Sequence, residues 1–151
     1  MAAAWGLART HGIAGFALHA LARELGILYA HFDSKHALYD AMFTDGNRQL
    51  NEQLNGLELP NDPRAALKLF THAWVDFALD DPARYSLLFQ RPIPGYEPSA
   101  GAYVYAQAAF GRVVELLHAA GVVEPGDLDC CVAMVNGLME SQFANDPGGD
   151  R

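Results

Sequence analysis

Apolar residues recur along this chain with the spacing of amphipathic α-helices. No stretch alternates at every second residue for long enough to indicate a β-strand. The pattern therefore predicts a chain built only of helices. We expect them at residues 2–11, 18–25, 34–55, 63–79, 82–90, 100–120 and 127–145, with a short helical piece at 28–31.

Capping residues mark where several of these helices begin. Asp62 and Asp81 each precede a proline, and proline is tolerated at the first helical position after an aspartate cap. Ser99 and Asp127 are the expected caps of the last two helices. Residues 91–98 form the one long irregular segment, which three prolines stiffen.

Two predicted helices of the second half carry apolar stripes. The stripe of helix 63–79 consists of Ala66, Phe70, Ala73, Trp74 and Phe77, and that of helix 127–145 consists of Leu128, Cys131, Val135, Leu138 and Gln142. Because such a stripe is stable only when another element covers it, we expect the two to pack on each other and on helix 100–120.

The first 43 residues hold a more specific pattern. A short helix ends at Gly12, a second apolar segment ends at Gly26, and a tight run then leads into the helix near Ser34. Seven residues follow the spacing L-Y-x-H-F-x-S-K-x-x-L: Leu28, Tyr29, His31, Phe32, Ser34, Lys35 and Leu38. This pattern resembles the DNA-binding head of TetR-family transcriptional regulators. The fragments 81–89 and 145–149 also resemble that family.

The resemblance implies an all-α protein of two parts. Residues 1–45 would form a three-helix helix-turn-helix head, and residues 46–151 a helical-bundle domain for effector binding and dimerisation. Members of the family usually repress transcription, binding a palindromic double-stranded DNA operator as a homodimer. A small effector then rearranges the two heads, so that their spacing no longer fits successive major grooves. The resemblance implies no cofactor.

The motif is shorter than the family pattern at one point. Ile27 is followed directly by Leu28, where the family has the rest of the turn and the first turn of the recognition helix. About four residues are absent from the end that reads bases. Two hypotheses explain the missing residues. Either the sequence as given omits residues of the protein, which is the hypothesis we favour, or the chain carries a true deletion. The second hypothesis leads to another function, a degenerate helical protein that binds a ligand or partner but no DNA.

Charge bears on the DNA hypothesis because duplex phosphates repel an acidic protein, and the net charge here is −8. Residues 1–48 are neutral, however, and the whole excess of acid lies in residues 49–151. A near-neutral head on an acidic body fits a head that approaches phosphate. Since no run of 18 apolar residues indicates a membrane span and the start lacks a basic leader region, we expect a cytoplasmic protein without a membrane partner.

Tyr29, His31 and Lys35 are the candidate DNA-binding residues, because family residues at these positions touch phosphates and all three side chains can donate to phosphate oxygens. Lys35 also lies at a helix start, which favours an anion. Tyr29 could instead be a core aromatic residue, and His31 a solvated or capping histidine. The residues better interpreted as the core of the head are Phe32, Leu18, Leu21, Ala22 and Leu38.

The predicted body has large apolar side chains on helices that should converge, and family members usually bind their effector between such helices. With a few polar anchors, these residues would suit a hydrophobic or aromatic effector, although plain core packing is the alternative for each one. The ligand-binding candidates are Trp74, Phe77, Phe89, Tyr103, Gln107, Phe110, Met134 and Asn136. The family dimerises through its last two helices, and the expected interface residues are Val135, Leu138, Met139 and Gln142.

Other chemistry finds no support in the sequence. His31 and His36 are five residues apart without a ligand pattern, so we expect no metal site. There is no G-x-S-x-G, H-E-x-x-H or glycine-rich phosphate motif, so we expect no enzyme and no catalytic residues. Cys130 and Cys131 are neighbours on a helix and point apart, which favours packed thiols over a disulfide, with a redox sensor or a soft-metal site as the alternative.

Overall fold

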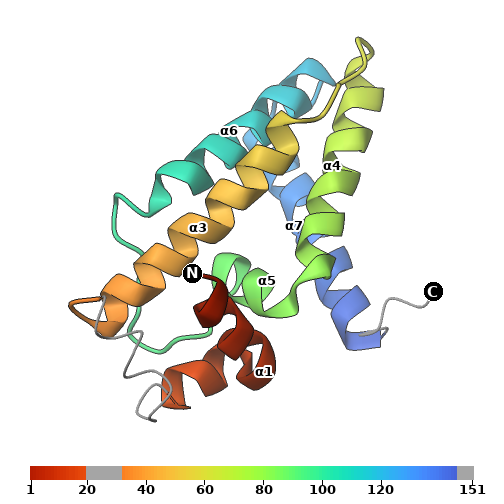
Figure 1. Cartoon of the computed structure of the whole chain (residues 1–151). Coiled ribbons are helices and arrows are strands. Elements are labelled where there is room, and N and C mark those ends of the chain that lie inside the picture. Colours follow the sequence, from red (N-terminus) through yellow and green to blue (C-terminus); the bar gives the residue numbers. More distant parts are fainter. Residues whose placement is uncertain (20–31, 146–151) are drawn as a thin grey trace. The chain divides into compact units, whose positions relative to one another are not determined.

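The computed structural model describes residues 1–19 and 32–145. Every regular element in these two ranges is an α-helix, as the sequence predicts, and none of the described residues lies in a strand. The helices, labelled as in Figure 1, are α1 (Ala2–His19), α3 (Lys35–Asn55), α4 (Pro63–Asp80), α5 (Pro82–Phe89), α6 (Tyr103–Ala119) and α7 (Pro125–Asn145). The piece predicted at 28–31 and most of the helix predicted at 18–25 lie outside the described residues.

Gly12 divides α1 where the sequence predicts the end of the first helix. Its φ of 68° and ψ of 159° belong to a region that is nearly restricted to glycine. The next helical stretch begins directly after Gly12, whereas the sequence analysis placed its start at residue 18. That prediction was wrong because a single glycine makes the whole turn, and the buried Ile13 follows it at once.

The caps agree with the sequence at α4 and α5 and differ at α6 and α7. Asp62 accepts a hydrogen bond from the Ala65 N–H at 2.8 Å, and Asp81 caps α5 in the same way. Ser99 accepts from the Ala102 N–H at 3.3 Å, but it caps the turn before α6, because that helix begins at Tyr103 rather than at residue 100. Asp127 is not the cap of α7, because the helix already begins at Pro125, where proline costs no hydrogen bond.

The chain packs into two compact units, which are described separately. The first combines Met1–Gln49 with Asp81–Ala106, and the second combines Leu50–Asp80 with Gln107–Arg151. Residues 1–45, the predicted head, thus pack with α5 and with the segment between α5 and α6, which the sequence analysis assigned to the body. The functional boundary near residue 45 stays a prediction.

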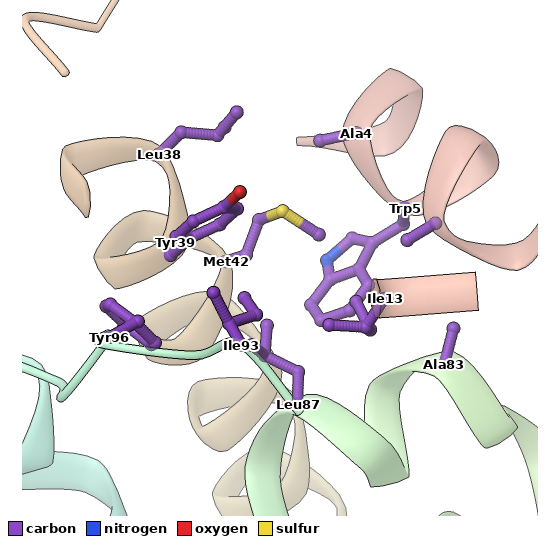
Figure 2. Packing of buried hydrophobic residues seen from close by; sticks show 11 residues of the cluster. Ala4, Trp5, Ile13, Leu38, Tyr39, Met42, Ala83, Leu87, Ile93 and Tyr96 are labelled. Carbon is purple, nitrogen blue, oxygen red and sulfur yellow. The ribbon is translucent and has the colours of Figure 1, made fainter. Parts of the chain in front are cut away.

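The core of the first unit is made by α1, α3, α5 and the segment that follows α5 (Figure 2). Trp5 of α1, Met42 of α3 and Leu87 of α5 point into it, and the small residues Ala4 and Ala8 let α1 come close. Its buried members are Ala4, Trp5, Ala8, Ile13, Leu38, Tyr39, Met42, Ala83, Leu87, Ile93 and Tyr96. The predicted core positions of Leu38 and Phe32 are confirmed, since Leu38 is fully buried and Phe32 packs against the cluster.

In the second unit α4 packs on α7, as the apolar stripes predict. Phe70 and Phe77 of α4 are buried there, together with Met139 of α7. The predicted α7 stripe is wrong at one position, because Leu138 is 58% exposed while Met139 is fully buried. The buried face runs from Val135 to Met139, four residues further on, whereas the predicted stripe ran from Val135 to Leu138, three residues further on.

No helix in the described part of the chain is long and apolar enough to cross a membrane. Among the same residues, no group of three or more His, Cys, Asp or Glu side chains could hold a metal ion.

Candidate functional site

Of the three DNA-contact candidates, only Lys35 is among the described residues. Tyr29 and His31 lie outside them. Lys35 is the first residue of α3 and is exposed, and the hydroxyl of Ser34 caps the helix by accepting from the Ala37 N–H at 3.0 Å. The partial positive charge at a helix start adds to the lysine ammonium, so this end of α3 favours an anion.

One turn further along α3, Asp40 fastens the helix to the segment between α5 and α6. Oδ1 of Asp40 accepts from the Tyr96 hydroxyl at 2.8 Å and from the Ser99 N–H at 3.1 Å. The Tyr96 ring stacks on His36 with the ring centroids 5.9 Å apart. It also meets the Tyr39 ring edge-on at 5.3 Å. The start of α3 is therefore held by directed contacts as well as by the apolar core.

These contacts shift the pKa of both partners. Burial raises the pKa of Asp40, but hydrogen bonds from Ser99 and Tyr96 outweigh it, so the pKa lies below its ordinary value of 3.8. Burial and the hydrogen bond to Asp40 raise the pKa of Tyr96 well above its ordinary value. At neutral pH the contact therefore joins a charged carboxylate to a protonated hydroxyl, which is the stronger kind of hydrogen bond.

The second unit contains an apolar cavity of about 240 Å³ that opens to solvent, since Phe110 and Met134 in its wall are 50% and 66% exposed. Its walls come from α4, α6 and α7 and consist of Leu67, Phe70, Thr71, Trp74, Phe110, Val113, Leu117, Cys131, Val132, Met134, Val135 and Asn136. Four predicted ligand-binding residues are thus brought together, namely Trp74, Phe110, Met134 and Asn136. Asn136 is a candidate polar anchor in walls that are otherwise mostly apolar.

The other four ligand-binding candidates do not line this cavity. Phe77 is buried in the core of the second unit, and Gln107 is exposed on α6. Phe89 and Tyr103 belong to the first unit, where they border a separate cavity of about 160 Å³. Tyr103 packs there edge-on against Phe43, with the ring centroids 5.4 Å apart. The expectation that all eight residues converge on one cavity is therefore corrected to four.

Val113 and Leu117 line the cavity and were not predicted as ligand-binding residues, although their spacing contained a signal. They follow the predicted Phe110 at steps of three and four residues along α6, which places all three on one helix face. Cys131 and Val135 belong to the predicted apolar stripe of α7 and also line the cavity, four residues apart. Large side chains alone are therefore an incomplete signal for the lining.

The chemistry of the cavity favours a neutral ligand, since none of its lining residues is charged. Arg112 of α6 directly precedes the lining residue Val113, and its guanidinium already has partners. It lies over the Phe70 ring, 5.7 Å from the centroid, and donates a hydrogen bond to Asn55. A carboxylate in the cavity would therefore have no basic partner among the lining side chains.

The predicted dimer residues are not all on one surface. Leu138 is exposed on α7, and the neighbouring Gly137 has open space where a side chain would stand. Met139 is fully buried within the unit, and Val135 lines the cavity. Gln142 is half-buried. Among the four predicted interface residues, Leu138 is thus exposed, Val135 and Gln142 are partly exposed, and Met139 is buried.

Comparison with known proteins shows the family. Residues 67–144 match the model of the tetracyclin repressor-like C-terminal domain, which is more than half of the chain and contains every lining residue of the 240 Å³ cavity. The chain therefore belongs to the TetR family.

Three curated relatives carry names that describe their activity. The chain is 27% identical over 166 aligned residues to HTH-type transcriptional regulators of Mycobacterium bovis and of two strains of Mycobacterium tuberculosis. The alignments cover 93% of this chain and 65% of each relative, so the chain spans slightly less than two thirds of their length. No solved structure matches the chain significantly.

Proposed function

We propose that this chain is a TetR-like transcriptional regulator, and no enzyme, that binds DNA through its N-terminal head and a small neutral effector in the cavity of its second unit. The observation that carries the proposal is that the cavity lies wholly within the part of the chain that matches the family's C-terminal domain. The motif between Leu28 and Leu38 and the names of the relatives support the DNA-binding part. Repression relieved by the effector is the mode we propose, which requires the protein to work in the cytoplasm beside the chromosome.

The effector we propose is neutral and apolar or aromatic. Trp74 and Phe110 offer ring surfaces from two different helices, and Asn136 offers an amide that can orient one polar group. Burial of a charge without a partner is costly, which disfavours anionic effectors in this cavity.

We also propose a homodimer, which the operator-binding mode of the family requires. The exposed Leu138 and the open space beside Gly137 support a close approach of a second helix to α7. A stable interface of this kind buries upwards of about 1,000 Å² in total. Met139 supports the interface from within rather than at its surface, because it is fully buried.

A second candidate function follows from the short turn after Ile27. The family pattern has about four more residues at this point than the chain has. A head that lacks the first turn of its recognition helix would lose base contacts. The chain would then act as a ligand- or partner-binding protein without an operator.

The two candidates differ in their binding to duplex DNA. We would select duplexes from a random-sequence library with the wild-type chain and measure the affinity of the enriched duplex over a series of salt concentrations. A regulator enriches a palindromic sequence, and its affinity falls steeply as salt rises. Failure to enrich any duplex would favour the second candidate.

Lys35→Ala tests the phosphate contact in the same assay. Because a phosphate contact positions without specifying, the variant should bind all sequences more weakly and lower the salt slope by about one. Lys68→Ala is the matched control, since it removes the same charge from an exposed position of α4. If the two variants bind alike at every salt concentration, Lys35 is not a DNA contact.

A further inference from the structure

An ion pair that the sequence analysis did not predict ties α1 to α5. Nε and Nη2 of Arg9 donate to Oδ2 of Asp81 at 2.9 and 2.8 Å. The Asp81 side chain is 2% exposed, whereas that of Arg9 is 56% exposed. The other carboxylate oxygen of Asp81 accepts from the Arg84 N–H at 3.1 Å. One buried carboxylate thus caps α5 and holds α1 at the same time.

The contact continues through side chains into α3 and returns to α1. Nη1 of the buried Arg84 donates to Oε1 of Gln49 at 3.1 Å, and Nε2 of Gln49 donates to Oδ2 of Asp45 at 2.7 Å. The same Oδ2 accepts from the Trp5 indole N–H at 2.9 Å. The series of polar contacts therefore links α1, α5 and α3 within the first unit. We call it the Arg9–Trp5 network, with members Trp5, Arg9, Asp45, Gln49, Asp81 and Arg84.

Both apolar and polar contacts hold α1. Trp5 and Ile13 are buried in the core, and Ala4 and Ala8 contribute only small side chains to it. Burial of apolar surface is non-directional, whereas a buried hydrogen-bonded network favours one geometry. The Arg9–Trp5 network therefore adds directed contacts between α1 and α5 to the apolar packing.

We propose that the Arg9–Asp81 pair is a positioning device that sets the orientation of α1, the first helix of the head, against α5. In this view α5 moves with the head, although the sequence analysis assigned it to the body. Arg9 acts through Asp81 and need not touch DNA. The consequence for DNA binding rests on the proposed function, while the consequence for α1 does not.

The first arm of the test uses no DNA and reads the environment of Trp5. In a Trp74→Phe background Trp5 is the only tryptophan of the chain, and its buried indole reports the seating of α1. Arg9→Gln should shift its emission to longer wavelength and raise acrylamide quenching about twofold or more, because a loosened α1 exposes the ring. Asp81→Asn should do the same and still cap α5, since asparagine is a good cap.

The control and the rescue keep this arm decisive. Arg91→Gln removes an equal charge from an exposed ion pair with Glu97, in which the atoms are 3.5 Å apart, and should leave the emission unchanged. Arg9→Lys should restore most of the wild-type signal. The double variant Arg9→Gln with Asp81→Asn should show no larger effect than either single one, because partners in one contact are not additive. Unchanged emission in Arg9→Gln would overturn the proposal.

The second arm measures affinity for the duplex that the wild-type chain enriches. Removing the negative charge of Asp81 should strengthen DNA binding if charge alone mattered. A positioning role predicts the opposite, a loss of about fivefold in Asp81→Asn. Asp62→Asn, which makes the same charge change at the exposed cap of α4, is the matched control. Equal affinity of these two variants would overturn the DNA part of the proposal. If the wild-type chain enriches no duplex, the DNA part fails together with the proposed function, and the emission arm alone decides whether the pair seats α1.

Discussion

Single side chains determine how the start of α3 is held. Asp40 is a clear case, because its carboxylate gathers a hydroxyl and a backbone N–H from a segment more than 50 residues away in the sequence. Asp45 plays a similar part further along α3. Burial raises its pKa, but hydrogen bonds from Arg48, Trp5 and Gln49 outweigh this and hold the pKa below its ordinary value. Both carboxylates are therefore expected to stabilise the first unit in their charged form.

Asp40→Asn should reduce the stability of the protein at neutral pH by about 1–2 kcal/mol, because hydrogen bonds to a charged acceptor are lost. The pKa of Asp40 is lowered in the folded state, so its contribution is fully present above its ordinary value of 3.8 and disappears as the pH falls through the lower folded value. The difference in the free energy of unfolding between wild type and variant should thus shrink as the pH falls below about 4. Urea unfolding at a series of pH values measures it.

Asp62→Asn is the control for this profile, since Asp62 is exposed at the start of α4. If the destabilisation caused by Asp40→Asn is the same at pH 7 and pH 3, the charge of Asp40 does not contribute to stability.

At the scale of elements, Gly12 gives α1 its bend, and the buried Ile13 follows directly after it. Gly12→Ala should destabilise the protein by about 1–3 kcal/mol, because the φ of 68° with ψ near 159° is strained for any residue with a Cβ. Gly6→Ala, in a regular part of the same helix, should instead stabilise it by about 0.5–1 kcal/mol. Denaturant unfolding of the two variants measures both effects.

The comparison isolates the backbone, because an added Cβ meets no atom within 4 Å at either glycine. Equal stabilities of Gly6→Ala and Gly12→Ala would contradict the bend as a constraint of the fold.

The positions of the helices were largely predictable, whereas their mutual arrangement was not. Periodicity and caps are local signals, so α3, α4 and α5 begin within one residue of their predicted starts. The rotation of each helix about its axis determines which side chains meet across helices. Hydrophobicity alone does not show whether Leu138 or Met139 is the next buried residue after Val135, because both side chains are apolar. The same limit explains why the cavity contains four of the eight predicted ligand-binding residues.

The contacts that bind distant segments were beyond sequence reasoning for a different reason. Arg9 and Asp81 are ordinary charged residues in a single sequence, and nothing near either one indicates its partner. The short spacing of Phe110 and Val113, by contrast, contained enough information to predict a shared face. The residues that share a face of one helix could be predicted from the sequence, whereas the contacts between helices could not.

At the scale of the whole molecule, the acidic charge and the cavity favour the same class of effector. The excess of negative charge lies in residues 49–151, and the cavity inside that part has no charged lining residue. The negative charge of this part would repel an anionic effector, and an anion in the cavity would find no basic lining residue to pair with. Naphthalene, a neutral aromatic probe, should therefore bind to the wild-type chain and raise its melting temperature, while 1-naphthoate of similar shape should not.

Trp74→Ala should weaken naphthalene binding about tenfold, because the largest ring surface of the cavity is lost. Because this truncation also enlarges the cavity, Val113→Phe is a second variant that fills it. The control is Leu69→Ala, which alters an exposed residue of α4 that does not line the cavity. Both lining variants should bind less naphthalene than this control. Both lining variants should keep the wild-type affinity for the enriched duplex, because the cavity belongs to the second unit and Lys35 to the first. Isothermal titration with the two probes measures these differences. Equal binding of naphthalene and 1-naphthoate, or unchanged binding in both lining variants, would place the effector site outside this cavity.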